Sequence, residues 1–382
     1  MGHESTRRVL IAGGGIAGLA VRRALHRRGI PSLTLERRET PEETGLAINL
    51  PGNAVRALAD LGLLEGLRAV GSRVRRREYR TASDRLLFAV DEDTFWGYEY
   101  GPHCVRRADL LRLLDRGLPA EDVRRGVSVN AVRPSPGRHA LELADGSTET
   151  GALLVGADGI HSMLRRCLFG DQAPGVALLA TQSWRFMAPN PGLEAWTLWA
   201  GNGALFLLIP VDRGEAYGWV SAPDGFAPGA GPTALEAVFA PFPRLVRDTL
   251  AAALAQPASL HHSPLAEVRI PAWSRDSVIL VGDAAHASAS VWAQGAALAL
   301  EDALVLADLT ATRSDWGHLG AAFEALRRPR VDHVQAMTDR MSRSARMPPW
   351  ARRVLLPIIG PRSYRATYLP LREPALTPAG GE

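Results

Sequence analysis

The sequence predicts an α/β protein in which a parallel sheet of the nucleotide-binding type is interrupted by an antiparallel sheet and followed by helices. Three glycine-centred segments support this prediction, at 13–18, 156–159 and 282–286, and each follows a short apolar run of the length of a buried strand. A tryptophan-rich region from about 176 to 223 separates the second segment from the third. The segments that form the nucleotide-binding fold are therefore expected to come from distant parts of the chain.

The first glycine segment has the context of a dinucleotide-binding turn, because an apolar strand-like run precedes it and a run with helical spacing follows it. Gly13 permits the tight turn, Gly15 lets the backbone approach a pyrophosphate, and Gly18 lets the helix pack on the strand. The start of the helix, at Ile16 and Ala17, offers N–H groups to the anion.

An acidic residue ends the second predicted strand. Residues 32–35 form this strand, and Glu36 follows them about 20 residues after the glycines. A carboxylate there accepts hydrogen bonds from an adenosine ribose and disfavours a 2′-phosphate, so FAD or NAD fits better than NADP. Arg37 is expected beside the adenosine. A glycine-rich turn without a ligand is the alternative, which the strand, the helix and Glu36 together disfavour.

Length and composition limit the class of protein. A chain of 382 residues favours two joined domains, and 46% hydrophobic with 22% charged residues is typical of a globular protein. All 44 basic residues are arginine, and the net charge of only +4 gives no reason to expect a nucleic-acid partner.

Two cysteines, Cys104 and Cys167, are too few for a disulfide framework and lack metal-ligand spacing. We therefore expect no metal site and a cytoplasmic protein. We find no apolar run long enough to span a membrane and no signal peptide at the N-terminus. The apolar segment 347–359 is expected to be a C-terminal helix packed on the body, with contact to a membrane surface as the alternative.

At the three glycine segments the chain resembles the single-component FAD-dependent aromatic monooxygenases, the family typified by p-hydroxybenzoate hydroxylase. The run 154–165 is similar to the family's Asp-Gly motif, and 281–286 with 293–295 and 301–303 is similar to its Gly-Asp motif. The resemblance covers nearly the whole chain. It implies a Rossmann-like FAD-binding domain interrupted by an antiparallel-sheet substrate domain, with a C-terminal helical segment.

Domain boundaries follow from this organisation. A helix is expected at 234–255, where the inserted sheet ends, and a long helix at 296–309. We assign 1–72, 100–170 and 265–330 to the FAD-binding domain, 73–99 and 171–264 to the substrate domain, and 331–382 to the C-terminal segment.

The resemblance assigns roles in cofactor binding. Asp283 would accept hydrogen bonds from the ribityl hydroxyls of FAD, and Arg107 would lie near the flavin chain or the pyrophosphate. Gly295 and Ala296 open the next helix, so their N–H groups can face the isoalloxazine edge. Asp158 would lie in the FAD cleft and take part in NAD(P)H engagement, with a loop cap as the alternative.

Three residues are candidates for catalysis. Arg185 and Tyr217 lie where family members often place substrate-facing groups, and a cation beside a phenolic hydroxyl lowers its pKa and favours electrophilic attack. A structural arginine and an ordinary strand tyrosine are the alternatives. Ser290 stands where the family usually has proline, and Ala293 where it usually has glycine.

The resemblance implies an FAD-dependent monooxygenase that uses NADH or NADPH and O2 to hydroxylate or epoxidise an aromatic or electron-rich small molecule, via a flavin C4a-hydroperoxide. The substrate would be aromatic or polyketide-like, in secondary metabolism or aromatic catabolism, and the protein a monomer or homodimer. A flavin-dependent halogenase is disfavoured, because that chemistry uses a catalytic lysine and the chain has none. Two alternatives stay open: a related reductase or oxidase without oxygen insertion, and a flavin- or product-binding protein that has lost turnover.

Overall fold

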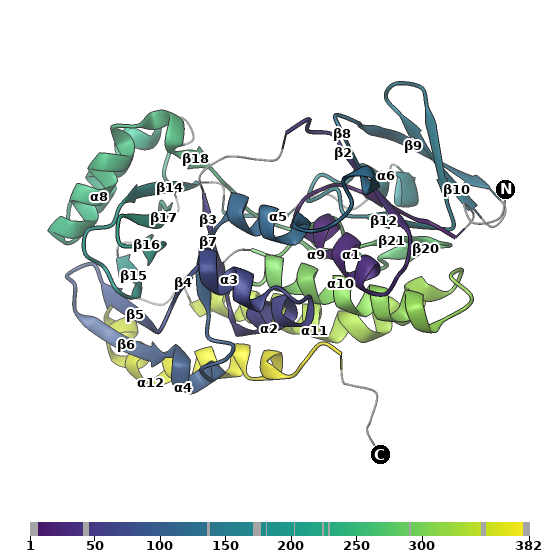
Figure 1. Ribbon diagram of the computed structural model, residues 1–382. Helices are drawn as coiled ribbons and strands as arrows, with labels where there is room; N and C mark the ends of the chain where they lie inside the picture. Colours follow the sequence, from purple (N-terminus) through teal and green to yellow (C-terminus); the bar gives the residue numbers. More distant parts are fainter. Residues whose placement is uncertain are drawn as a thin grey trace, which may run out of the picture.

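Two sheets lie at opposite ends of the molecule in the computed structural model, with long helices running between and below them (Figure 1). The structure describes residues 7–40, 46–135, 138–170, 177–180, 182–201, 203–223, 225–227, 230–289, 292–344 and 349–376. Among these residues, no helix is both long enough and apolar enough to span a lipid bilayer.

The first sheet is the parallel nucleotide-binding type that the sequence predicts. Its central strands are fully buried, which matches their continuous apolar sequence. Only β20, at one edge, runs antiparallel to its neighbour. In spatial order the strands are β20 (Ser274–Arg275), β21 (Val278–Leu280), β12 (Leu153–Gly156), β1 (Val9–Ala12), β2 (Ser32–Glu36) and β8 (Val123–Arg125).

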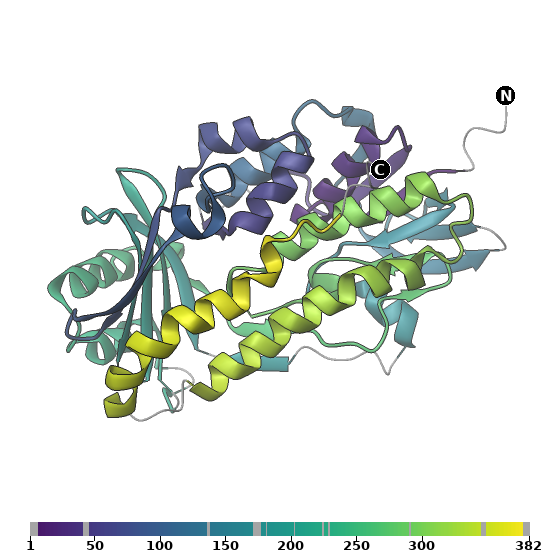
Figure 2. The same ribbon diagram turned by 90° about the horizontal axis from the view of Figure 1, so that it is seen from below.

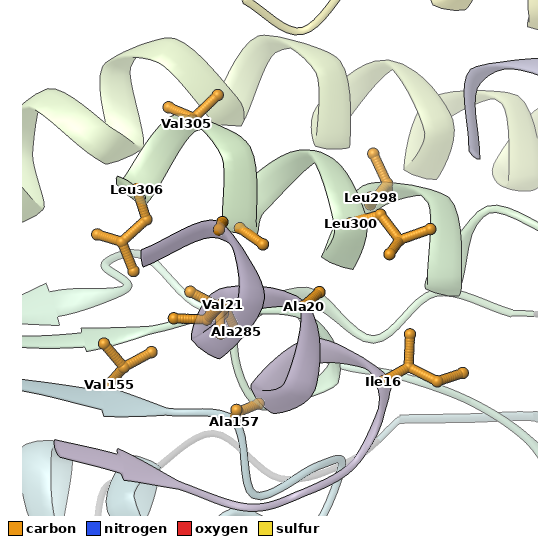
Figure 3. Close-up of a cluster of buried hydrophobic side chains, with 14 of the residues drawn as sticks. Ile16, Ala20, Val21, Val155, Ala157, Ala285, Leu298, Leu300, Val305 and Leu306 are labelled. Carbon is orange, nitrogen blue, oxygen red and sulfur yellow. The ribbon is translucent and has the colours of Figure 1, made fainter. Parts of the chain in front are cut away.

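Helix α1 (Ile16–Arg27) packs between this sheet and helix α10 (Gly295–Thr312), as Figure 3 shows. Ile16, Ala20 and Val21 of α1 lie near Leu298 and other apolar residues of α10 (Figure 3). Because α10 is apolar on nearly all sides, most of its length is buried in this core. The glycine loop at the start of α1 is thus held on a rigid core.

The second sheet contains seven strands within the described part of the chain. Most neighbours are antiparallel, as predicted, but β15 and β5 pair in parallel. This pairing brings the segment 73–99 against the tryptophan-rich region. In spatial order the strands are β18 (His261–His262), β14 (Ser183–Pro189), β17 (Glu215–Ser221), β16 (Ala204–Pro210), β15 (Trp196–Gly201), β5 (Arg76–Thr81) and β6 (Leu86–Asp91).

The faces of the seven-stranded sheet are covered differently. One face carries Trp184, Phe186, Trp199 and Phe206 and packs on α7 (Leu235–Phe239) and α8 (Arg244–Leu254). The prediction of one helix over 234–255 was wrong, because the chain breaks at 240–243, where two prolines stand. The opposite face is turned toward the interior of the molecule.

The two longest helices among the described residues stand near the end of the chain. Helix α11 (Leu319–Ser344) crosses the predicted domain boundary at 330, and α12 (Pro349–Tyr368) runs beside it below the seven-stranded sheet (Figure 2). The remaining strands are β3 (Ala47–Leu50), β4 (Ser72–Arg73), β7 (His103–Arg106), β9 (Val129–Ser135), β10 (Arg138–Leu143), β11 (Thr148–Gly151), β13 (Ala177–Ala180) and β19 (Leu265–Glu267). The remaining helices are α2 (Gly52–Asp60), α3 (Leu64–Val70), α4 (Glu92–Trp96), α5 (Arg107–Asp115), α6 (Met163–Phe169) and α9 (Asp283–His286).

Candidate active site

The three glycine segments meet at one edge of the parallel sheet. Ala12, the last residue of β1, pairs with Gly156 of β12, and Gly156 pairs with Leu280 of β21. Each glycine segment therefore follows the carboxyl end of one of three adjacent strands. This edge is where parallel α/β sheets bind dinucleotides.

Two of the loop glycines are required by the protein itself. Gly13 has φ +107°, and a Cβ there would lie 2.3 Å from the carbonyl oxygen of Ala157. A Cβ on Gly18 would lie 1.8 Å from the carbonyl oxygen of Gly13. The loop therefore closes on β12 and on its own helix only because both residues lack a side chain.

Gly15 differs from these two glycines, because a Cβ built on it would meet no atom within 4 Å. It is the N-cap of α1, and no side chain caps this helix start. The open backbone at Gly15, with uncapped N–H groups behind it, is the cradle that a pyrophosphate needs. The loop thus fits the diphosphate of FAD.

Glu36 lies beside the glycine loop. Its carboxylate accepts hydrogen bonds from the backbone N–H of Gly14, at 2.5 Å, and of Arg38, at 2.9 Å. Arg37 is exposed at the end of β2. The carboxylate is thus close to the loop, where the sequence predicts an adenosine ribose.

Asp158 adopts the capping geometry that the sequence left as an alternative. Its Oδ2 accepts hydrogen bonds from the N–H groups of Met163, at 2.7 Å, and Leu164, at 3.1 Å, at the start of α6. Arg165 then donates to the carbonyl oxygen of Ala284 in α9, at 2.9 Å. The Asp-Gly segment is therefore tied to the Gly-Asp segment, and the role of Asp158 toward a cofactor stays a prediction.

One cavity of about 880 Å³ extends from the glycine loop to the seven-stranded sheet. Nine of the predicted site residues line it: Gly15, Ile16, Ala17, Arg107, Arg185, Tyr217, Asp283, Gly295 and Ala296. Gly13, Gly18, Glu36, Arg37 and Asp158 lie outside its lining, and Ser290 lies outside the described residues. Ala293 also lines the cavity, and its φ of +54° is in the left-handed region that favours the glycine usual in the family.

Asp283 opens α9 and is exposed to the cavity. The protein walls around the carboxyl desolvate it and raise its pKa. His286, Arg107 and Arg185 oppose the rise. Because hydrogen-bond donors stabilise a carboxylate on a desolvated cavity wall, Asp283 is suited to bind the hydroxyls of a ribityl chain.

The start of α10 is held by a pair of amides. Gln294, the N-cap, exchanges hydrogen bonds with Asn53 of α2, at 3.0 and 3.2 Å. Asn53 also donates to Glu301, at 2.9 Å. All three side chains are buried, so the uncapped first turn of α10, at Gly295 and Ala296, is fixed against the cavity.

A buried ionic network lies behind this helix. Arg327 of α11 donates to Asp302, at 2.8 Å, and to Glu301, at 2.9 Å. His286 Nε2 lies 2.7 Å from Asp302, on the carboxylate oxygen that also accepts from the N–H of Gly282. Burial alone would raise the pKa of Asp302, but His286 and Arg327 outweigh it and lower the pKa to about 2. An ionised Asp302 therefore ties α10 and α11 to the Gly-Asp segment.

The inner face of the seven-stranded sheet forms the far wall of the cavity. Strand register places Arg185 of β14 opposite Trp219 of β17, and Tyr217 opposite Met187. Because successive side chains of a strand alternate between faces, these residues point to the same side. Leu198, Leu205, Leu207, Ile209 and Trp196 continue the wall across β16 and β15. The wall is thus apolar and aromatic, with polar groups at Arg185 and Tyr217.

Tyr217 is buried, which raises the pKa of its hydroxyl, while the nearby Arg185 opposes this rise. The tyrosine therefore stays protonated at neutral pH. The two side chains offer a cation and a hydrogen-bond donor on neighbouring strands.

Sequence reasoning missed several residues of the cavity wall. The indole N–H of Trp219 and the side-chain amide of Asn49 are buried and have no hydrogen-bond partner among the described residues, yet both residues line the cavity. The two-residue spacing of Trp219 from Tyr217 on one strand is the signal that could have identified it. Trp199, by contrast, is in the core on the other face and donates to Asp84, at 2.8 Å. Arg77 of β5, one of the arginines clustered at 73–77 in the sequence, also lines the cavity.

Comparisons with known proteins give consistent matches over most of the chain. The profile of a family described as "FAD binding domain" matches residues 6–338. A 3-amino-4-hydroxybenzoate 2-monooxygenase of Streptomyces cremeus is 31% identical in an alignment 356 residues long, which covers 89% of this chain and 88% of the relative. A 3-hydroxybenzoate 6-hydroxylase of Aquipseudomonas alcaligenes is 33% identical in an alignment 322 residues long, which covers 78% of this chain and 79% of the relative. The structure of HpxO of Klebsiella pneumoniae with FAD and uric acid superposes with a TM-score of 0.82, at 25% identity, covering 96% of this chain and 93% of the other.

Proposed function

Because the chain belongs to the family of FAD-dependent aromatic monooxygenases, we propose that it hydroxylates a phenolic ring held against Arg185 and Tyr217. The observation that carries this proposal is that one cavity contains both the dinucleotide-loop residues and this pair. A substrate on the sheet wall would therefore share an enclosed space with the bound cofactor.

The chain's own residues would hold FAD along the edge of the parallel sheet. The backbone at Gly15 would face the pyrophosphate, Glu36 the adenosine ribose, and Asp283 the ribityl hydroxyls. The first turn of α10, at Gly295 and Ala296, would offer N–H groups to the isoalloxazine ring. The redox chemistry, which is acceptance of a hydride from NAD(P)H and oxygenation of the substrate with O2, would be supplied by bound FAD.

Arg185 and Tyr217 would prepare the substrate. A guanidinium beside a phenol favours the phenolate, which makes the ring carbons ortho and para to the oxygen more electron-rich. Tyr217 stays protonated, so it can donate a hydrogen bond to that phenolate oxygen. The N–H of Trp219, in register with Arg185, is a further donor on the same wall.

The apolar wall has a second function in this proposal, because side chains such as Leu198 and Leu207 exclude water from the reacting groups. Exclusion of water strengthens the interaction of the cation with the phenolate and limits loss of the activated oxygen as peroxide.

We propose a hydroxybenzoate or aminohydroxybenzoate as the substrate class, since two relatives are named for such compounds. The test is a panel of these acids and of phenols without a carboxylate, incubated with purified FAD-loaded protein and either NADH or NADPH. We expect at least one member to accelerate NAD(P)H oxidation and to give a product heavier by one oxygen atom. Oxidation that yields only hydrogen peroxide with every compound would argue against the proposal.

A further inference from the structure

The C-terminal helix α12 lies beyond the region that the family profile matches, which ends at residue 338. Two of its tyrosines, Tyr364 and Tyr368, are nevertheless among the most buried large side chains of the protein, at 2% and 0% exposure. The helix lies against β6 below the seven-stranded sheet (Figure 2). Its tyrosines thus reach into the interior beneath the cavity wall.

The two tyrosines contact a buried ion pair. Arg77 of β5, which lines the cavity, forms a salt bridge with Glu92 of α4, and both side chains are almost completely buried. The hydroxyl of Tyr364 donates to Glu92 Oε2, at 2.5 Å, and Arg77 Nη1 donates to the hydroxyl of Tyr368, at 3.3 Å. The guanidinium also lies 5.0 Å from the ring centroid of Trp196, on the cavity wall.

Tyr368 makes one further contact, which leads back to the site. Its hydroxyl donates to the carbonyl oxygen of Trp292, at 2.7 Å. Trp292 directly precedes Ala293, the residue with a left-handed backbone, and Ala293 precedes the N-cap Gln294 of α10. The peptide that enters this unfavourable conformation is therefore held by a side chain of α12.

The segment 292–296 is thus fixed from two directions. Tyr368 binds the carbonyl oxygen of Trp292, and Asn53 binds the side chain of Gln294. A left-handed alanine persists only where its surroundings maintain it. Without the Tyr368 hydroxyl, the carbonyl oxygen of Trp292 would lose this hydrogen bond, while the Asn53 pair would still hold the side chain of Gln294.

We propose that Tyr368 is a positioning residue for the monooxygenase reaction. It holds the segment 292–296 so that the N–H groups of Gly295 and Ala296 face the cofactor site, and Arg77 and Glu92 hold Tyr368 in turn. The effect of Tyr368 on catalysis rests on the proposed function, whereas its restraint of the segment 292–296 rests on the geometry alone. Loss of one hydrogen bond, at its net contribution to stability, changes the equilibrium ratio of restrained to released segment 292–296 by about fivefold.

The test compares Tyr368→Phe with two other tyrosine variants of the full-length, FAD-loaded protein. Tyr364→Phe removes the bond to Glu92 but leaves the Trp292 carbonyl bonded. Tyr98→Phe is the surface control, because Tyr98 is 72% exposed. The first readout is amide hydrogen exchange of a peptide covering residues 293–297, and the second is the ratio of peroxide to hydroxylated product.

We expect exchange of this peptide to be about fivefold faster in Tyr368→Phe, and unchanged in Tyr98→Phe. The peroxide-to-product ratio should rise in the same variant, with the FAD dissociation constant within about twofold of wild type. Unchanged exchange in Tyr368→Phe would overturn the proposal. Equal acceleration in Tyr364→Phe and Tyr368→Phe would also overturn it, because that result indicates general loosening of α12.

Two controls separate the possible failures. If the wild-type protein hydroxylates no phenol, the proposed function fails, while hydrogen exchange still tests the role of Tyr368. If Tyr368→Phe does not fold, native-state exchange of the wild type in low urea replaces it. The peptide at 293–297 should then open together with the peptide containing Tyr368, and independent opening would contradict the proposal.

Discussion

Two glycines of the first loop should respond in opposite ways to the same substitution. Gly15→Ala adds a methyl group that meets no protein atom within 4 Å, whereas Gly18→Ala adds one 1.8 Å from the carbonyl oxygen of Gly13. The backbone of Gly15, at φ −77° and ψ −168°, is also accessible to alanine. Gly15→Ala should therefore affect only the ligand, and Gly18→Ala the fold.

The magnitudes follow from these contacts. Gly15→Ala restricts the unfolded chain, which stabilises the folded protein by about 0.4–1 kcal/mol. Alanine is also a weaker N-cap than glycine, so the free energy of unfolding of the apoprotein changes by less than about 1 kcal/mol in total. The methyl group holds the pyrophosphate away from the backbone, and loss of one charged hydrogen bond, about 1.5–3 kcal/mol, weakens FAD binding about 10- to 150-fold. For Gly18→Ala the neighbour is backbone, and overpacking costs about 1–3 kcal/mol.

The assay has two parts for each variant. Thermal unfolding of the apoprotein reports on the fold, and titration with FAD, followed by flavin fluorescence, reports on binding. We expect Gly15→Ala to unfold at the wild-type temperature but to bind FAD weakly, and Gly18→Ala to unfold several degrees lower. An unchanged FAD dissociation constant in Gly15→Ala would show that this backbone does not face the pyrophosphate.

Three further predictions concern the cavity and its support. Asp283→Asn should weaken FAD binding about 10-fold or more, as titration with FAD would show. Desolvation raises the pKa of Asp283 in the folded apoprotein above its value in the unfolded chain. At a pH between these two pKa values the folded protein binds more protons than the unfolded chain, so its free energy of unfolding falls as the pH rises through this range. Across this pH range the free energy of unfolding should fall less in Asp283→Asn than in the wild type. An equal fall in both proteins would contradict a raised pKa at Asp283. Arg185→Ala and Tyr217→Phe should lower hydroxylation in steady-state assays while FAD titrations match the wild type; unchanged kcat and KM would give both a structural role. Arg327→Met should lower the free energy of unfolding by about 3–5 kcal/mol in urea titrations, since Asp302 then loses a buried cation, and a loss below about 1 kcal/mol would contradict this.

Much of the cofactor half of the site was predictable, because local sequence patterns indicate where its loops lie. An apolar strand followed by glycines and a helix predicts where a loop lies, and three such units on adjacent parallel strands place their loops together. Alternation along β14 and β17 likewise explains why Arg185 and Tyr217 share a face. These inferences need only periodicity and strand order.

The support of the site was not predictable in this way. The contact of Arg77 with Tyr368 joins residues 291 positions apart, and that of Glu92 with Tyr364 spans 272 positions, so no local pattern marks them. Asp158 shows a different limit, because one carboxylate in a loop fits both a cap and a ligand.

Oxygen-isotope labelling distinguishes insertion of oxygen from O2 into the substrate from simple release of peroxide. The FAD-loaded protein would be supplied with NAD(P)H, a phenolic substrate that accelerates its oxidation, and 18O2 in unlabelled water. We expect a hydroxylated product that carries one 18O atom. A product whose new oxygen comes from water, or stoichiometric peroxide with the substrate unchanged, would contradict it.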